Sequence, residues 1–424
     1  MPTDRSTLPS DAIAHHWGAG PAPRYDALAA RFRPVFARIR AGSVEREIER
    51  RLPTEEIAWL RRAGFTALRV PHSSDASGAS GVTLPELFAL LVELSEADSN
   101  LTQALRAHFG FVEHALAKPP ARRDVWLNRL AEGQIVGAAW SETGDAKQAN
   151  FSTVLSHGGN GWRLNGTKFY TTGSLYADWI HVGASDAEGA PVSVTIERKA
   201  RGVEVLDDWD GMGQRLTASG TSRFIDVPVD ENEIVADGPP FAYSEAFYQL
   251  VHIATLAGIG RALASDVATA LATRKRGYSH AAAPLPANDP QLLEIAGRLR
   301  ANAYSAGAIV QLAAVALERA AAFAGQTTDD ALLAVTQAEL EIWQAQTVVS
   351  QLVLDATTDA FDALGASATL RSAGLDRYWR NARTITSHNP RVYKDRIVGD
   401  FAVNGKLPPG QWRIGQVDGV GSAD

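Results

Sequence analysis

The hydrophobic pattern changes twice along the 424 residues, and these changes constrain the fold more than any other feature. From 25 to about 134, apolar residues recur at three- and four-residue spacing, which is typical of amphipathic helices. From about 135 to 237, apolar and polar residues nearly alternate in short runs that end at Gly, Asn or Asp, which indicates strands. After 238 the pattern returns to long Ala- and Leu-rich helices. The sequence therefore predicts a mainly α, α+β fold.

Individual elements can be placed within this pattern. The middle part predicts strands at Ile135–Trp140, Gly161–Leu164, Ile180–Val182, Val192–Ile196 and Arg223–Val227. The last part predicts helices at Phe241–Lys275, Gln291–Phe323, Asp329–Leu364 and Leu375–Thr384. The expected divisions are a flexible N-terminal segment (1–24), an N-terminal helical domain (25–134), a central β-barrel domain (135–237) and a C-terminal helical bundle with a C-terminal tail (238–424).

Composition excludes several classes of function. The formal net charge is −7 and no long Lys/Arg run occurs, so neither nucleic acid nor an anionic membrane surface is an expected partner. The first ten residues are polar and no apolar run approaches a membrane span, so a cytoplasmic location is expected. The absence of cysteine excludes disulfides, thiolate metal ligands and a cysteine nucleophile, and no metal site is predicted.

The first polar segment, Gly137–Gly144, lies at the end of the first predicted strand and contains Trp140 and Ser141. Backbone N–H groups and hydroxyls at the end of an apolar strand suit the polar edge of a flavin ring. The alternative is an ordinary turn at the end of a strand.

The second polar segment is Leu164–Gly173. Within it, Asn165-Gly166 predicts a tight hairpin, and the strand that follows carries Thr171 and Thr172 at its far end. A hydroxyl there is placed to reach a flavin. The alternative is that threonine occurs only because it favours strands.

The third segment, Asp208–Thr221, is rich in glycine and leads into a strand that ends in Val-Pro-Val. These three segments, in this order and spacing, resemble the acyl-CoA dehydrogenase superfamily. The resemblance implies an N-terminal helical domain, a central β-barrel and a C-terminal four-helix bundle around a flavin. It assigns cofactor contacts to Trp140, Ser141, Thr171, Thr172, Gly173, Trp209, Arg215 and Ser219.

The fourth segment, Asp376–Pro390, carries the functional distinction. In acyl-CoA dehydrogenases a similar helix end is followed by a loop whose Glu removes the α-proton of the thioester, but no Glu occurs here after Asp376. The other position that the superfamily uses for this base corresponds to His252. Because desaturation needs a carboxylate at one of these places, both departures count against it.

The pattern Arg-Thr-x-x-x-His-x-Pro-x-x-Tyr-Lys instead is similar to the flavin-dependent monooxygenases of the dibenzothiophene monooxygenase type. The resemblance, over roughly 94–405, implies that His388 faces the flavin from the loop after Arg383 and that Thr172 lies beside the oxygen-reacting carbon. His108 is a further catalytic candidate. A loop histidine and a packed helix histidine are the alternatives for His388 and His108.

Two departures from this family lie near the expected flavin: its Asn corresponds to Ala138 and its aromatic hydroxyl to Phe111. Aromatic side chains at Phe111, Trp140 and Trp209 are expected to shape the substrate pocket, with ordinary core packing as the alternative. FAD-binding members carry a Gly-Gly-x-Gly turn where this chain has Ala363–Ala368 with one glycine, so FMN is preferred over FAD. Its phosphate needs cations, and the candidates are Arg274, Arg276 and Arg383.

The resemblance implies that reduced FMN reacts with O2 to give a C4a-(hydro)peroxyflavin, which oxygenates a small organic substrate, preferably an organosulfur compound. The chain has no dinucleotide-binding fingerprint, so a separate NAD(P)H:flavin reductase is the expected source of FMNH2. A homotetramer is expected, because in the family a neighbouring subunit completes the flavin site. The alternatives are an FAD-dependent acyl-CoA dehydrogenase, an N-hydroxylase of an amine and a non-enzymatic binding protein.

Overall fold

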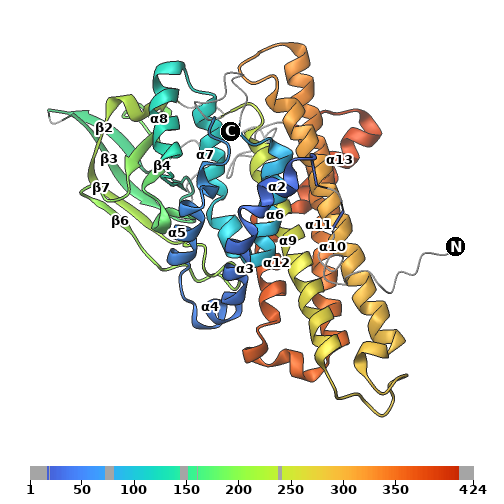
Figure 1. Cartoon of the computed structure of the whole chain (residues 1–424). Coiled ribbons are helices and arrows are strands. Elements are labelled where there is room, and N and C mark those ends of the chain that lie inside the picture. The colour runs from blue at the N-terminus through green and yellow to red at the C-terminus, as the bar shows by residue number, and fades with distance from the viewer. Residues whose placement is uncertain are drawn as a thin grey trace, which may run out of the picture.

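The computed structural model describes residues 17–18, 20–71, 81–143, 151–159, 161–236 and 241–409, and the structural statements below concern these residues. Most of the expected flexible segment (1–24) and Gly144 of the first polar segment lie outside them. Figure 1 shows the sheet on one side of the molecule, the long C-terminal helices on the other, and N-terminal helices between them. The order of helices, sheet and helices is the one that the hydrophobic pattern predicts.

The N-terminal part is helical, as expected. Its elements are α2 (Tyr25–Ala30), α3 (Arg33–Ala41), α4 (Ser43–Glu49), α5 (Thr54–Arg62), η2 (Phe65–Ala67), α6 (Leu84–Ala104), α7 (Arg106–Leu116) and α8 (Pro120–Ala131). A capping box starts α6: Thr83 Oγ1 accepts the Glu86 N–H, and the Glu86 carboxylate accepts the Thr83 N–H. Extended backbone at Asp98 (φ −162°, ψ 109°) interrupts α6 before its last turns.

The middle part forms one eight-stranded sheet. Its strands are β1 (Val136–Ala139), β2 (Val154–Gly158), β3 (Gly161–Lys168), β4 (Trp179–Ser185), β5 (Pro191–Glu197), β6 (Val203–Val205), β7 (Ser222–Val229) and β8 (Ile234–Ala236). The strand order is β6-β7-β3-β2-β4-β5-β8, and β1 pairs with β4 in parallel. Short helices η3 (Ser174–Tyr176) and η4 (Glu231–Glu233) interrupt the connections.

The hairpin expected at Asn165-Gly166 is wrong. Both residues lie inside β3, where the pairing with β7 shifts register between Leu164 and Gly166. The pair serves this bulge: Asn165 Oδ1 accepts the Asp226 N–H (2.8 Å), and a Cβ on Gly166 would lie 2.4 Å from Thr153 Oγ1. Glycine is therefore needed for a close approach within the sheet, not for a tight turn.

The C-terminal part holds α9 (Ser244–Thr273), η5 (Pro286–Asn288), α10 (Pro290–Ala321), α11 (Asp329–Leu364), η6 (Ala366–Thr369), η7 (Arg371–Ala373), α12 (Asp376–His388) and α13 (Arg391–Asn404). Two expectations are corrected here. His388 is the last residue of α12 rather than part of a loop, because Ile385 packs into the core and Pro390 stops the helix only after it. Part of the expected tail is the helix α13.

One hydrophobic core joins the N-terminal helices to the C-terminal helices, and the inner residues of the sheet form a second core. A third, smaller cluster packs α7 and α8 against β1. The 30-residue helix α9 is long and apolar enough to cross a membrane, but 83% of its most apolar window is buried within the protein. Its apolar character is therefore accounted for by core packing.

Candidate active site

The three polar segments of the middle part meet where their strands end. The Phe169 N–H donates to the Ser141 carbonyl (2.9 Å), which ties the first segment to the second. The Gly173 N–H donates to the Thr217 carbonyl (2.9 Å), which ties the second segment to the glycine-rich loop (Asp208–Thr221). The structure therefore brings the expected cofactor contacts of these segments together.

The backbone of these segments is strained. Outside glycine, the left-handed region is occupied at Tyr170 (φ 59°), Gln214 (φ 52°) and Ala218 (φ 52°). Such conformations cost about 1–3 kcal/mol each and persist where the surrounding structure demands them. All three residues flank the hydroxyl-bearing positions of the site.

Three of these hydroxyls form a directed chain. Thr217 Oγ1 donates to the Gln214 carbonyl (2.8 Å) and lies 2.7 Å from Ser219 Oγ, which lies 2.8 Å from Thr172 Oγ1. Each hydroxyl has one proton to donate. Because Thr217 donates its only hydroxyl proton to a carbonyl, Ser219 must donate to Thr217, and Thr172 must donate to Ser219. The outward side of Thr172 Oγ1 is therefore an acceptor.

The junction of α6 and α7 lies against this chain. Gly173 has φ 81°, and a Cβ there would lie 2.2 Å from the Ala104 carbonyl oxygen. Only glycine permits this approach. Arg106, at the start of α7, follows two residues after that carbonyl and is thereby placed near the threonine segment.

Two histidines meet on the helical side. The rings of His252, on α9, and His388, at the end of α12, have centroids 4.4 Å apart. His252 is 1% exposed, and neither of its ring nitrogens has a hydrogen-bond partner. His388 is exposed. The two histidines that the sequence resemblance singles out, one on α9 and one at the end of α12, are thus neighbours here.

Both imidazoles are neutral near pH 7. Although part of its surface stays accessible, His388 is surrounded by protein atoms, and this desolvation, followed by the charge of Arg106, lowers its pKa to about 4. The same two effects, with His388 itself, lower the pKa of His252 well below its usual value. His388 Nδ1 lies 3.1 Å from Asn389 Oδ1, and Asn389 Nδ2 donates to Gln249 Oε1 (2.8 Å). This orientation puts the proton on His388 Nδ1 and leaves Nε2 as an acceptor.

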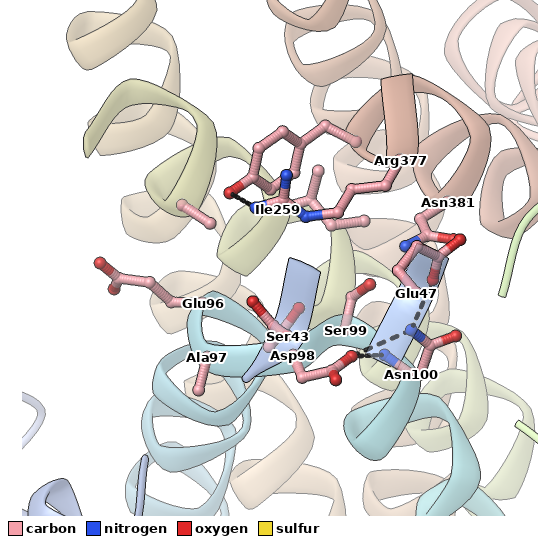
Figure 2. Close-up of a pocket in the computed structure, with 13 residues that line it drawn as sticks. Ser43, Glu47, Glu96, Ala97, Asp98, Ser99, Asn100, Ile259, Arg377 and Asn381 are labelled. Atoms are coloured by element: carbon pink, nitrogen blue, oxygen red, sulfur yellow. Dashed lines mark hydrogen bonds between the residues drawn. The ribbon is translucent and has the colours of Figure 1, made fainter. Parts of the chain in front are cut away.

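Buried polar contacts fix α12 relative to the glycine-rich loop. Figure 2 shows the residues around a small cavity where α4, the break in α6, α9 and α12 meet. The volume of this cavity is about 20 Å³. Glu47 on its wall pairs with Arg380 (2.8 Å), and Asn381 Oδ1 accepts the Gln214 N–H (2.6 Å). Asn100 Oδ1 accepts the Leu216 N–H (3.2 Å). The helix that ends in the catalytic candidate and the loop that holds the hydroxyl chain therefore share one scaffold.

The expected substrate-pocket aromatics do not form one group. Phe111 and Trp140 both contact His181, with ring centroids 5.3 and 5.4 Å away, and Phe111 is 2% exposed within a packed cluster. Trp209 instead contacts Tyr170 (5.8 Å) and donates its indole N–H to the Gln214 carbonyl. The half-buried Trp140 is the member that adjoins Ser141.

His108 serves the packing of the fold. Its Nε2 lies 2.7 Å from the Thr66 carbonyl, and its Nδ1 accepts the Val136 N–H (3.3 Å). Burial lowers its pKa to about 4 against a smaller opposite effect of the Thr66 bond. Since both ring nitrogens are engaged within the chain, the packed-histidine alternative accounts for this residue.

The three phosphate candidates lie apart from the histidine pair. Arg274 and Arg276 line a cavity of about 100 Å³ at the far end of α9, and Arg274 donates to the Leu364 carbonyl (2.6 Å). At about 1.5 Å per residue, the helix separates Arg274 from His252 by about 33 Å, which exceeds the length of FMN. Arg383 is exposed and lies about 140° around α12 from His388. Within one chain, neither end-of-helix arginine reaches a flavin beside His388.

Arg106 and His252 were missing from the expected site residues. Arg106 is an isolated cation in an otherwise apolar stretch, and His252 stands one helical turn after Tyr248 in an apolar helix. A lone polar residue in a core helix is the signal that marks both positions. Arg215, by contrast, donates weakly to the Glu47 carbonyl (3.4 Å) and acts within the scaffold.

Comparisons with known proteins agree with this geometry. Residues 250–391 match the family model described as acyl-CoA dehydrogenase, C-terminal domain. The dibenzothiophene monooxygenase of Mycolicibacterium goodii is 29% identical over 86% of this chain and 91% of its own length. A probable FMNH2-dependent monooxygenase, SfnC of Pseudomonas putida, is also 29% identical, over 86% of this chain and 92% of its own length. The crystal structure of TdsC from Paenibacillus sp. A11-2 with FMN and indole superposes with a TM-score of 0.81 at 26% identity. The match covers 91% of this chain and 99% of the TdsC chain.

The chain is a relative of the flavin-dependent monooxygenases that have the acyl-CoA dehydrogenase fold. Its enzyme class, an oxidoreductase of the flavin-dependent monooxygenase type, follows from these relatives. The resemblance to the dibenzothiophene monooxygenase type that the four sequence segments indicate is therefore confirmed.

Proposed function

We propose that this protein is the oxygenating component of a two-component flavin-dependent monooxygenase. It would use FMNH2, supplied by a separate NAD(P)H:flavin reductase, and O2 to oxygenate a small organic substrate. The contact between His252 and His388 carries the proposal, because neither position that the superfamily uses for a carboxylate base holds a carboxylate. Abstraction of a carbon-bound α-proton by a neutral imidazole with a pKa near 4 is unfavourable.

The residues present fit FMN on their donor and acceptor chemistry. The hydroxyl chain and the backbone around Ser141 offer polar groups to the ring, and His252 has two buried nitrogens without partners. Bound reduced FMN would supply the electrons and activate oxygen. The relatives named for FMNH2 and solved with FMN support this cofactor over FAD.

The direction of the hydroxyl chain suggests how Thr172 would act towards the cofactor. Since its proton is donated to Ser219, it would accept a hydrogen bond rather than donate one to the cofactor. Reduced flavin carries an N–H at its central ring where oxidised flavin has a bare nitrogen. An acceptor at this place therefore favours reduced FMN, as a protein that takes FMNH2 from solution requires.

His388 would control a proton at Nε2. Its Nδ1 proton is held by Asn389, so Nε2 would be free to accept a hydrogen bond from an O–H group at the reaction site. Its lowered pKa lets it release any proton that it takes up. The buried His252 ring behind it would fix the orientation of the imidazole and exclude water.

An organosulfur substrate is preferred, because the dibenzothiophene monooxygenases are among the relatives with full-length similarity. The test is turnover of a panel of thioethers, sulfinates, aromatic amines and indoles with FMN, a flavin reductase, NADH and O2. Mass spectrometry should detect addition of oxygen to at least one thioether or sulfinate. Tightly bound FAD that survives dialysis and is bleached by acyl-CoA would contradict the proposal.

A further inference from the structure

Among the described residues, Arg106 has no ion-pair partner. Its Nε donates to the Tyr248 carbonyl (3.1 Å), and its guanidinium lies 4.7 Å from the centroid of the Tyr248 ring. Among the acidic groups, Glu245 acts on the pKa of Arg106, and it does so less strongly than desolvation.

Desolvation makes this lack of a counter-charge costly. Arg106 is partly buried, and desolvation by the protein atoms around it lowers its pKa to about 10, against smaller opposite effects of Tyr248 and Glu245. A desolvated cation is normally paired, because removing a charge from water costs several kcal/mol unless an opposite charge or hydrogen bonds compensate. Four of the five N–H donors of a guanidinium remain after the bond to Tyr248. A negatively charged ligand would accept hydrogen bonds from these donors and compensate the positive charge.

The surroundings of Arg106 are built for an acceptor ligand. Beyond the effect of desolvation, the positive charge of Arg106 lowers the pKa of both His252 and His388, which indicates that the three groups are close enough to interact electrostatically. His252 is a buried donor without a partner in the described structure, and the adjoining His388 is exposed. The cluster thus combines a guanidinium with imidazole groups on a side open to solvent, and no carboxylate forms an ion pair within it.

We propose that the substrate of this enzyme carries an anionic group, a carboxylate, sulfinate or sulfonate, which Arg106 and His252 bind beside His388. This rests on the proposed function and deepens it. A guanidinium binds such planar or trigonal oxyanions through two parallel hydrogen bonds. Arg106 and His252 would hold the charged end, which orients the rest of the substrate past the exposed His388. The phosphate of FMN has the same chemistry, so the experiment must separate the two sources.

The test uses thioanisole, its anionic analogue 4-(methylsulfanyl)benzoate and its cationic analogue 4-(methylsulfanyl)benzylamine. Equilibrium dialysis measures their binding to the protein with oxidised FMN, where no turnover occurs. The wild type should bind the carboxylate about tenfold or more tightly than thioanisole, and the amine weakest. Arg106→Gln should remove this difference, while Arg106→Lys should retain part of it. Arg298→Gln removes a cation from the exposed surface of α10 and should change nothing.

Equal binding of the three compounds by the wild type would overturn the inference, as would an unchanged preference in Arg106→Gln. A parallel titration with FMN and riboflavin separates the phosphate: if Arg106→Gln reduces the advantage of FMN over riboflavin instead, Arg106 serves the cofactor and the inference fails. If the carboxylate preference depends on Arg106 but no compound is oxygenated with FMNH2 and O2, the anion site stands and the proposed function fails.

Discussion

At the scale of single residues, four histidines share a lowered pKa and differ in their contacts. Desolvation lowers the pKa of His108, His181, His252 and His388. His108 and His181 are bonded within the chain, whereas His252 has no partner and His388 is exposed. The sequence motif could identify His388. It could not separate His108 from a catalytic residue, because the partners that occupy its ring come from distant segments.

Replacing His388 by Ala should uncouple the reaction while leaving the fold intact, since the side chain is exposed at a helix end. We expect oxygenated product per NADH to fall about tenfold, with the difference appearing as hydrogen peroxide, because the acceptor that manages the proton is lost. Product analysis with a peroxide assay measures this. Ser387→Ala, on the preceding exposed residue, is the control. Wild-type coupling in His388→Ala would mean that the histidine only ends α12.

Replacing Ser219 by Ala should weaken the preference for reduced FMN. The change frees the Thr172 proton, so that Thr172 can donate as well as accept. One hydrogen bond of about 1 kcal/mol corresponds to a roughly fivefold change in the ratio of dissociation constants for oxidised and reduced FMN. Anaerobic titrations measure this ratio. The control Ser222→Ala removes a nearby buried hydroxyl that does not belong to the hydroxyl chain, and it should keep the wild-type ratio. An unchanged ratio in Ser219→Ala would refute the proposed direction of the hydroxyl chain.

His108 makes a prediction about stability and pH. Its folded pKa of about 4 lies below the unfolded value of 6.5, so its contribution is present above pH 6.5 and is lost as the pH falls towards 4. At about 1.4 kcal/mol per unit, the loss amounts to about 3 kcal/mol. His108→Gln keeps a donor and an acceptor but does not titrate. Urea unfolding should show that the free energy of unfolding decreases less between pH 7 and pH 4.5 in this variant than in the wild type. An equal decrease would contradict the packing role.

At the scale of elements, a buried ion pair holds the first polar segment on β3. Lys168 Nζ donates to Glu142 Oε1 (2.7 Å) and the Trp140 carbonyl (3.3 Å), and its side chain is fully buried. Burial alone would raise the pKa of Glu142, but the bonds from Lys168 and Thr153 outweigh it and lower the pKa to about 2. Lys168 therefore helps to position the segment that carries Ser141, together with Ser152 and Thr153, which also donate to Glu142.

Lys168→Met should destabilise the protein by about 3 kcal/mol or more, because it leaves the Glu142 carboxylate buried without its cation. FMN affinity should fall as well, since the Ser141 segment loses its anchor. Thermal unfolding and flavin titration measure both effects. Lys168→Met with Glu142→Gln should recover much of the stability, and failure to recover would show that the pair is not what stabilises the segment.

The types of the elements were largely predictable, and the errors have physical causes. Long apolar periodicity placed α9, α10 and α11 within a few residues. The short strands β2, β6 and β8 were missed, because a few residues carry too little alternation to stand out. Asn165-Gly166 failed because a bulge demands the same residues as a tight turn. α12 was placed too short because threonine and serine there bond back to helical carbonyls, a contact that local propensity does not reveal.

At the scale of the whole molecule, the helices before and after the sheet share one core. The division into three domains therefore stays a prediction, and the α6–α7 junction illustrates the difficulty, since it contacts both the sheet segments and α9. The motifs in the sequence could identify which segments meet at the candidate site. The placement of Arg106 near the two histidines depends on how distant helices pack, which no local pattern in one sequence records.

We expect the active enzyme to be a homotetramer in which a neighbouring chain completes the flavin site. Arg274 and Arg276 lie too far along α9 to serve a flavin beside His388 of their own chain, so only a second copy could bring them to its phosphate. Apolar side chains are exposed on the bundle, with Leu312 66%, Leu332 68% and Leu333 54% accessible. Contact between copies would cover such side chains.

Light scattering should therefore give a mass of about four times the 45.4 kDa of one chain. Replacing Leu332 and Leu333 by Glu should lower this mass and weaken FMN binding together, because the arginines of the neighbour are lost. Arg276→Gln should leave the tetramer intact and reduce the advantage of FMN over riboflavin, which separates the phosphate contact from assembly. A monomer with full FMN affinity and coupling would show that each chain holds its own flavin, with the phosphate bound by other residues of the same chain.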